Sequence, residues 1–373
     1  MKFTVSSTEL FSLLQTLSRV INAKNTMSVL DCYLFELYGQ QLTIQAGDGE
    51  NRIVGSVEVA ESDSDIRFAI SAKMLLDAIK EIPEQPITFQ MNEENYEMMI
   101  SYRNGSYKIV GQSADDYPAA NVMNEDRVRF QMDTDKLQLG INSTFFAISS
   151  DEFRPVMTGI YFDITPGTVV LVASDGRKLS RTTFSGINIQ EQRAAFILPG
   201  KPAGLLKNIL SKDAGTVQIE FDARYVSFQM PSYRVEARLL EGRYPNYNSV
   251  IPQDNPYHLT FDRMQLISAL RRVSVFSDTS NNQVKLTIDP GKVLFTAQDI
   301  DFSTSAEESL ECDYQGDHLE IAFNGNYFLE TLNNLSAQNI SIDLGDASRA
   351  GVVQPIEQEE NERQLMLLMP VML

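Results

Sequence analysis

The sequence repeats one pattern three times along the chain. The segment AGDGENR at positions 46–52 returns as ASDGRK at 173–178, and in a shorter form as AQDID at 297–301. An apolar stripe of helical period precedes each copy, and the pattern of a strand followed by a helix comes after each. Self-similarity at a period of about 125 residues predicts three copies of one folded module.

Each module is expected to contain two helices packed on antiparallel strands, which is an α+β architecture. Apolar periodicity predicts helices at 8–24, 72–82, 134–148, 200–212, 262–276 and 324–336. Short alternating runs broken by Gly, Asn and Asp predict strands over much of the remainder. Short polar junctions near 121–127 and 252–256 predict three modules with the boundaries 1–124, 125–253 and 254–373.

Composition argues against several classes of protein. No apolar run approaches the length of a membrane span and no apolar leader is recognisable, so we expect a cytoplasmic protein. Cys32 and Cys312 lie far apart in the sequence and suit a reducing compartment better than a disulfide. His258 and His318 are the only histidines, and neither has a partner at ligand spacing. We therefore expect neither a metal site nor a cofactor.

The distribution of charge is uneven. The chain carries a net charge of -19, which at first argues against a nucleic-acid ligand. The six predicted helices, however, hold eleven basic and six acidic residues, so the helices are positive and the remainder is strongly negative. Such a protein would present its helices to phosphates and repel DNA elsewhere. Because Lys and Arg are also ordinary helix formers on solvated faces, charge alone leaves both interpretations open.

The size of a module limits the rings that such a chain forms. A module of this length has a diameter of about 36 Å. Three modules closed into a triangle leave a hole of about 5 Å, whereas six leave a hole of about 36 Å, which a DNA duplex enters. A ring around DNA would therefore need two chains.

The sequence offers little support for catalysis. The turn at 174–179 would place Ser174 beside the carboxylate of Asp175, as a nucleophile beside a base. That aspartate recurs in all three modules while its neighbours vary, which favours a turn-forming role. The segment around Lys201 lacks a phosphate-binding loop, and no Ser-His-Asp or Cys-His arrangement is present. We expect no catalytic residues; an enzyme that uses the 174–179 turn remains the weaker alternative.

The segment 364–373 is apolar and contains three methionines. Its first part is predicted to be a core strand, and Pro370 predicts that the chain then leaves the sheet. Methionine suits surfaces that accept several partners. An exposed apolar segment beside a second apolar patch predicts a groove that binds peptides.

Four phrases together carry a resemblance to a known family: MKFTV at 1–5, ASDGRKL at 173–179, EGRYPNYNSVIP at 241–252 and MPVML at 369–373. With the threefold repeat, they make the chain resemble the bacterial replicative sliding clamps, the beta subunits of DNA polymerase III. The resemblance implies three tandem DNA-clamp modules and a head-to-tail homodimer. Its six modules would form a ring with helices lining the bore and sheets on the rim.

The resemblance also implies a function. The chain would be a non-catalytic processivity factor that encircles duplex DNA without sequence preference and tethers the replicative polymerase. Its partners would be a second copy, double-stranded DNA, the polymerase, the clamp loader and other proteins with short clamp-binding peptides rich in Gln and Leu or Phe, but no membrane. The alternative is a three-module protein-interaction scaffold that does not encircle DNA.

Three sets of residues follow from the resemblance. A partner-peptide cleft between the second and third modules would consist of Arg154, Met157, Ser174, Gly176, Lys178, Leu179, Pro245, Val250, Leu367 and Met369. Arg154, Ser174 and Lys178 would lie on its polar rim. The residues facing DNA would be Lys24, Lys73, Lys201, Arg271 and Arg272. The dimer seam would join Tyr107 and Ile109 of the first module to Val275 and Phe276 of the third.

Overall fold

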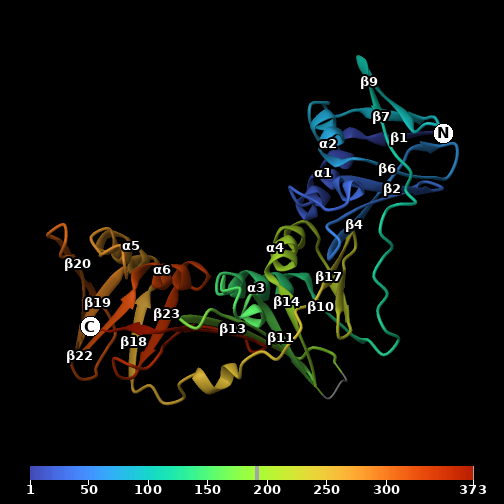
Figure 1. Cartoon of the computed structure of the whole chain (residues 1–373). Helices are drawn as coiled ribbons and strands as arrows, with labels where there is room; N and C mark the ends of the chain where they lie inside the picture. Colours follow the sequence, from blue (N-terminus) through green and yellow to red (C-terminus); the bar gives the residue numbers. More distant parts are fainter. Residues whose placement is uncertain (190–192, 373) are drawn as a thin grey trace. The chain divides into compact units, whose positions relative to one another are not determined.

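The computed structural model describes residues 1–189 and 193–372 (Figure 1). The chain divides into two compact units. The first comprises Met1–Leu137 and Gly204–Leu239, and the second comprises Gln138–Ala203 and Leu240–Leu373. Helices α3 (Thr134–Phe145) and α4 (Gly200–Ile209) each begin in one unit and end in the other.

The first unit contains two antiparallel sheets. The order of the five-stranded sheet is β5 (Glu61–Ser62), β1 (Lys2–Ser6), β7 (Pro86–Met91), β8 (Glu97–Tyr102) and β9 (Gly105–Val110). The order of the eight-stranded sheet is β10 (Val128–Asp133), β15 (Thr216–Phe221), β16 (Tyr225–Gln229), β17 (Tyr233–Arg238), β4 (Asn51–Glu58), β3 (Gln41–Gly47), β2 (Cys32–Tyr38) and β6 (Ile66–Ser71). Helices α1 (Ser7–Leu17) and α2 (Ala72–Lys80) pack on one another.

The second unit also contains one five-stranded and one eight-stranded antiparallel sheet. The order of its five-stranded sheet is β21 (Thr304–Glu311), β20 (Lys292–Asp299), β19 (Gln283–Asp289), β22 (Leu319–Asn324) and β26 (Pro370–Val371). The order of its eight-stranded sheet is β14 (Ala194–Pro199), β11 (Gly159–Thr165), β12 (Thr168–Ser174), β13 (Lys178–Ser185), β25 (Glu362–Leu368), β24 (Gly351–Pro355), β23 (Asn339–Leu344) and β18 (Tyr257–Asp262). Helices α5 (Arg263–Ser274) and α6 (Gly325–Asn333) pack on one another.

The six predicted helices are confirmed, although each ends earlier than the apolar pattern suggests. Beyond α1 and α4 the chain tightens into single 3-10 turns at Ser18–Val20 and Leu210–Lys212. Three helices begin at a residue whose side chain accepts a backbone N–H of the first turn: Ser6, Asp262 and Asn324. Such caps satisfy donors that have no partner inside the helix, so they define where each helix starts.

The recurring aspartates close hairpin turns, as the sequence predicted. The Oδ1 atom of Asp48 accepts the N–H of Asn51 at 2.7 Å, and that of Asp175 accepts the N–H of Lys178 at 2.9 Å. Asp299 accepts the N–H of Phe302 at 3.1 Å. Because a short carboxylate can replace the backbone acceptor of a tight turn, each repeat needs an aspartate at this position.

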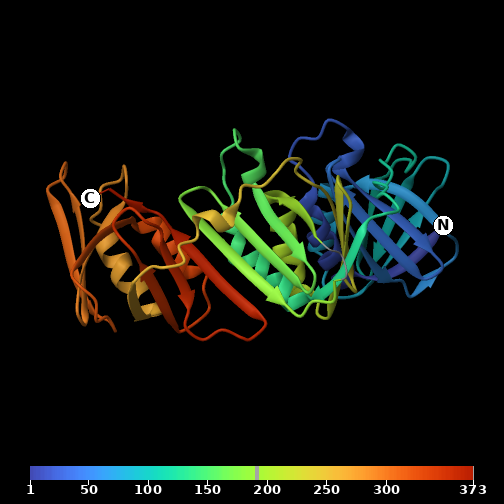
Figure 2. The same cartoon turned by 90° about the horizontal axis from the view of Figure 1, so that it is seen from below.

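Both eight-stranded sheets combine strands from neighbouring repeats. Strand β4 pairs with β17, and β13 pairs with β25. Figure 2 shows the second of these joins, where strands of the central part lie beside strands near the C-terminus. The sequence pattern did not indicate this continuity, because each strand alternates in the same way whether or not its partner lies in the same repeat.

Each unit has an aromatic and aliphatic core. In the first, the Phe3 and Phe89 rings stack with centroids 4.7 Å apart, and Phe35 lies 5.0 Å from Phe68. In the second, Phe295, Phe323 and Phe328 are buried with the inner faces of α5 and α6. No described helix has the length and apolar character that a membrane crossing requires.

Candidate functional site

An apolar pocket lies in the second unit, where β13 and β25 join. Its volume is about 260 Å³. It is lined by Met157, Ser174, Gly176, Arg177, Lys178, Leu179, Tyr244, Pro245, Asn246, Tyr247, Val250, Leu367 and Met369. Nine of the ten residues expected in the peptide cleft therefore surround one cavity, and Arg154 lies just outside this lining.

Strand pairing forms the floor of the pocket. Leu179 of β13 lies directly opposite Leu367 of β25, and both side chains are buried in one cluster. Beyond the end of β25, the N–H of Met369 donates to the carbonyl of Arg177 at 2.8 Å. This bond holds Met369 beside the turn that begins β13. Residues almost two hundred positions apart in the sequence thus become neighbours.

The segment that follows the second repeat forms the opposite wall. The ring of Tyr244 stacks on Tyr161 with centroids 4.7 Å apart, and the Tyr247 hydroxyl donates to Asp163 at 2.9 Å. Burial, followed by the hydrogen bond to Asp163, raises the pKa of Tyr247 to about 12. The phenol therefore stays protonated at neutral pH and continues to donate. These contacts hold Pro245 and Val250 over the cavity, with Val250 partly exposed.

Arg154 lies at the turn beside the pocket. Its Nε donates to Asp151 at 2.8 Å and its Nη2 donates to the carbonyl of Asp175 at 3.2 Å. The hydrogen bond from Arg154 lowers the pKa of the Asp151 carboxyl, and the N–H of Phe153 adds to this effect. Arg154 therefore links the loop 149–154 to the repeated turn while its side chain stays half exposed.

Two of the residues expected on the polar rim line the pocket, but their polar groups are bound inside the protein. The Ser174 hydroxyl is buried and donates to the carbonyl of Lys178 at 2.8 Å, inside the turn. The Lys178 side chain is only 7% exposed; its ammonium contacts Glu330 of α6 and lies 4.9 Å from the ring centroid of Tyr327. The charge expected on the rim is thus neutralised inside the protein by a carboxylate and an aromatic face.

Arg177, Tyr244, Asn246 and Tyr247 also line the pocket, although the sequence analysis did not assign them to it. Arg177 donates from Nη1 to the Tyr327 hydroxyl at 2.9 Å, so it takes a place on the rim next to α6. The phrases that carried the resemblance already contained all four residues. Their role was missed because a sequence pattern does not show which side chains of a loop point toward a distant strand.

The buried position of Lys178 predicts a measurable cost when its partner is removed. We expect Glu330→Gln to lower the free energy of unfolding by about 1 to 2 kcal/mol, because it leaves the nearly buried ammonium with only the more distant carboxylate of Asp175, at 3.9 Å. The matched control is Glu320→Gln, which breaks a more exposed pair with Lys285 at 2.7 Å and should change stability little. Denaturant unfolding measures both. Equal losses would contradict the importance of burial at Lys178.

Four of the five residues expected to face DNA have exposed side chains: Lys24, Lys73, Lys201 and Arg271. Arg272 is also exposed, but its guanidinium forms an ion pair with Glu308 of β21. That pair offsets the positive charge of Arg272 and ties α5 to the edge strand of its sheet.

The residues expected at the dimer seam lie on the edge strand of one sheet and beyond the end of one helix. Strand β9 is the last strand of its sheet and β21 the first of the other five-stranded sheet. Tyr107 and Ile109 belong to β9, where Ile109 is buried on the inner face and Val110 is exposed. Val275 and Phe276 follow α5, and Val275 is 77% exposed. Both edges carry hydrogen-bonding groups that a further strand would satisfy.

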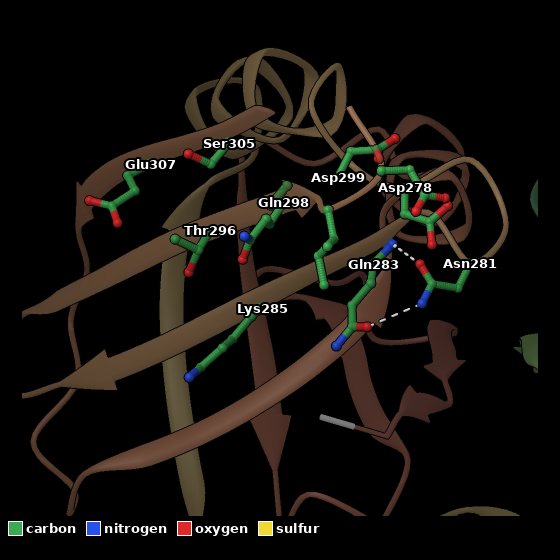
Figure 3. A pocket seen from close by; sticks show the side chains of 12 residues that line it. Asp278, Asn281, Gln283, Lys285, Thr296, Gln298, Asp299, Ser305 and Glu307 are labelled. Atoms are coloured by element: carbon green, nitrogen blue, oxygen red, sulfur yellow. Dashed lines mark hydrogen bonds between the residues drawn. The ribbon is translucent and has the colours of Figure 1, made fainter. Parts of the chain in front are cut away.

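A larger concavity of about 730 Å³ lies on the outer face of the second five-stranded sheet. In Figure 3, Lys285, Thr296, Gln298, Ser305 and Glu307 project from β19, β20 and β21 on the same side. This surface is polar and open, and its side chains do not form a nucleophile and base arrangement. Within the described ranges, no group of three or more His, Cys, Asp or Glu residues is placed to hold a metal ion.

Three family models match consecutive parts of the chain. The model of the DNA polymerase III beta subunit, N-terminal domain, matches residues 1–122. The model of the central domain of that subunit matches residues 131–246, and the model of its C-terminal domain matches residues 248–371.

Individual proteins are similar over the full length. The beta sliding clamp of Chlamydia muridarum is 27% identical over 378 residues, covering 100% of this chain and 99% of that protein. The beta sliding clamp of Pseudomonas aeruginosa is 24% identical over 373 residues, covering both proteins completely. Among solved structures, a sliding clamp (DNA polymerase III subunit beta) of Bartonella birtlesii bound to griselimycin has a TM-score of 0.92 at 28% identity. The Pseudomonas aeruginosa clamp bound to the same compound has a TM-score of 0.94 at 24% identity, and both comparisons cover 100% of each chain.

Proposed function

The chain belongs to the DNA polymerase III beta subunit family, the bacterial sliding clamps, and from this premise we propose that it encircles duplex DNA and tethers the replicative polymerase. It is a three-domain clamp and a non-catalytic component of the replication machinery. The full-length match of the three domain models carries this conclusion. We further propose the module boundaries 1–124, 125–253 and 254–373, and a cytoplasmic location, as suits a protein that acts on the chromosome.

The proposed ring is a head-to-tail homodimer of six modules. Its seam would join β9 of one protomer to β21 of the partner, with Tyr107 and Ile109 near the partner's Val275 and Phe276. Two observations support it. Each strand has only one strand neighbour in its sheet, so each leaves an edge open to a further strand. Exposed Val275 and Phe276 would add apolar area at the seam.

The proposed hold on DNA is topological. A closed ring does not leave an uninterrupted duplex even when its phosphate contacts are weak, and weak contacts permit sliding. The exposed cations Lys24, Lys73, Lys201 and Arg271 suit this role in an otherwise acidic protein: Lys73, Lys201 and Arg271 belong to α2, α4 and α5, and Lys24 lies in the segment after α1. Arg272 contributes less, since it is paired with Glu308.

Retention on circular DNA tests this proposal. We expect clamps loaded on nicked circular DNA to remain bound at high salt and to be released when the circle is cut open. Lys73→Ala combined with Lys201→Ala should weaken direct binding to DNA and lower its salt slope by up to about two, because each lost phosphate contact removes about one unit. Retention on the circle should survive in this variant. Loss from uncut circles at the same rate as from linear DNA would contradict the ring.

The apolar pocket is proposed to bind the clamp-binding peptides of the polymerase, the clamp loader and other partners. Its floor and walls are apolar, and its polar atoms are largely committed to internal hydrogen bonds, which leaves a preformed cavity for Leu or Phe side chains. Arg154 and Arg177 lie beside it for polar parts of the peptide. A non-encircling scaffold would bind the same peptides but would show no retention on circular DNA.

A further inference from the structure

The first unit contains a second place where strands of neighbouring repeats join, and it matches the peptide pocket position by position. Strand β4 pairs with β17 there, as β13 pairs with β25 at the pocket. The N–H of Arg238 donates to the carbonyl of Glu50 at 3.0 Å, and the N–H of Met369 donates to that of Arg177 at 2.8 Å. The two joins therefore share one backbone arrangement.

The surrounding turn and wall also correspond. Gly49 and Gly176 occupy the same turn position with φ angles of +95° and +89°. The pair Tyr117 and Pro118 follows the first repeat at the same distance as Tyr244 and Pro245 follow the second. Both tyrosines are buried. The fold thus provides the frame of a second pocket.

The side chains at the two floors differ in chemistry. Register places Arg52 opposite Glu236 in the first unit, where the pocket has Leu179 opposite Leu367. Arg238 takes the place of Met369. Three apolar residues of the pocket are thus replaced by three charged ones, although the backbone is shared.

Arg52 takes the place of Leu179 on the floor, and its long side chain reaches across to the wall formed by Pro118 and Ala119. Its Nη2 donates to the carbonyl of Pro118 at 2.9 Å and to that of Ala119 at 2.7 Å. Its Nε lies 4.0 Å from the carboxylate of Glu236. Arg52 is 9% exposed, so a ligand that displaced it would break these bonds and leave charges in a place that water reaches poorly.

We propose that Arg52 and Glu236 close this second copy of the pocket and thereby restrict each protomer to one partner-peptide site. The inference rests on the proposed peptide-binding function of the open pocket. Restricting partners to one site has a physical consequence for a ring. A homodimer presents two peptide sites instead of four, so that fewer partners occupy the same clamp at once.

The test counts bound peptides. The probe is a synthetic peptide containing Gln, Leu and Phe, titrated by calorimetry into the full-length protein. We expect one peptide per wild-type protomer, and two per protomer in the variant Arg52→Leu/Glu236→Leu/Arg238→Met. The variant Arg52→Met alone, which keeps the size of the side chain and removes its donors, should bind a second peptide more weakly. A folded variant of either kind that binds only one peptide would overturn the proposal.

The first unit with its native Arg52 and Glu236 provides a second test, which does not depend on the folding of the variants above. In Met369→Ala, which damages the open pocket, no saturable site of wild-type affinity should remain. If a second site of that affinity were present, the join at Arg52 would not be closed and the inference would be wrong. If the wild-type protein bound no peptide at all, the proposed function of the open pocket would fail first. The two failures are thus distinguishable.

Discussion

Replacing Met369 with alanine is expected to weaken binding of a clamp-binding peptide by about 30-fold, or about 2 kcal/mol. Met369 lines the pocket, and its backbone N–H, which the substitution keeps, holds it beside Arg177. Alanine removes the flexible thioether that would pack against the apolar side chain of the peptide. Fluorescence anisotropy with a labelled peptide measures the dissociation constant.

The matched control is Met372→Ala, three residues further along the same segment. Met372 is 94% exposed and does not line the pocket. We expect this variant to bind the peptide within about twofold of the wild type, as is usual outside a hot spot. Both variants should have the same mass in solution. Equal losses in the two variants would place the peptide outside the pocket.

Replacing Val275 with arginine is expected to convert the proposed homodimer into a monomer. Val275 is 77% exposed after α5, so arginine should be tolerated in the isolated chain. In the proposed ring, the same position is covered by the partner near Tyr107 and Ile109. An arginine there would bury an unpaired charge in an apolar contact, which costs several kcal/mol. Light scattering should change from twice 41.9 kDa to 41.9 kDa.

Val122→Arg provides the control for the seam. Val122 is also highly exposed, but it lies in the segment that connects the first two predicted modules and not at a sheet edge. The variant should remain a dimer at concentrations where Val275→Arg is a monomer. It should also be retained on circular DNA, whereas Val275→Arg should not. A dimeric Val275→Arg protein would show that the seam lies elsewhere.

The sequence predicted the features that depend on short stretches of chain. The six helices follow from apolar residues three and four positions apart. The repeated aspartates were interpreted as turn formers, and their hydrogen bonds confirm it. Each of these features is local because the groups that interact lie within a few residues of one another.

The resemblance assigned most of the pocket but not its polar contacts. Nine expected cleft residues line one cavity, because the phrases that contain them are specific. Lys178 was expected on the rim, yet its ammonium contacts Glu330. Arg177 was not assigned, although it lines the pocket and donates to Tyr327. No local pattern separates these two adjacent cations, since their directions depend on α6, about 150 residues further along the chain.

The amino-acid sequence alone was thus sufficient to predict the repeat, the helices and the turns. The phrases that resemble the sliding clamps were sufficient to indicate the family. The pairing of β13 with β25 and of β4 with β17 depended on the folded chain, because alternation within a strand does not specify its neighbour. These two pairings determine where the pocket lies and where its charged counterpart lies. Leu179 meets Leu367 in one and Arg52 meets Glu236 in the other, so similar repeats produce one open site and one closed site.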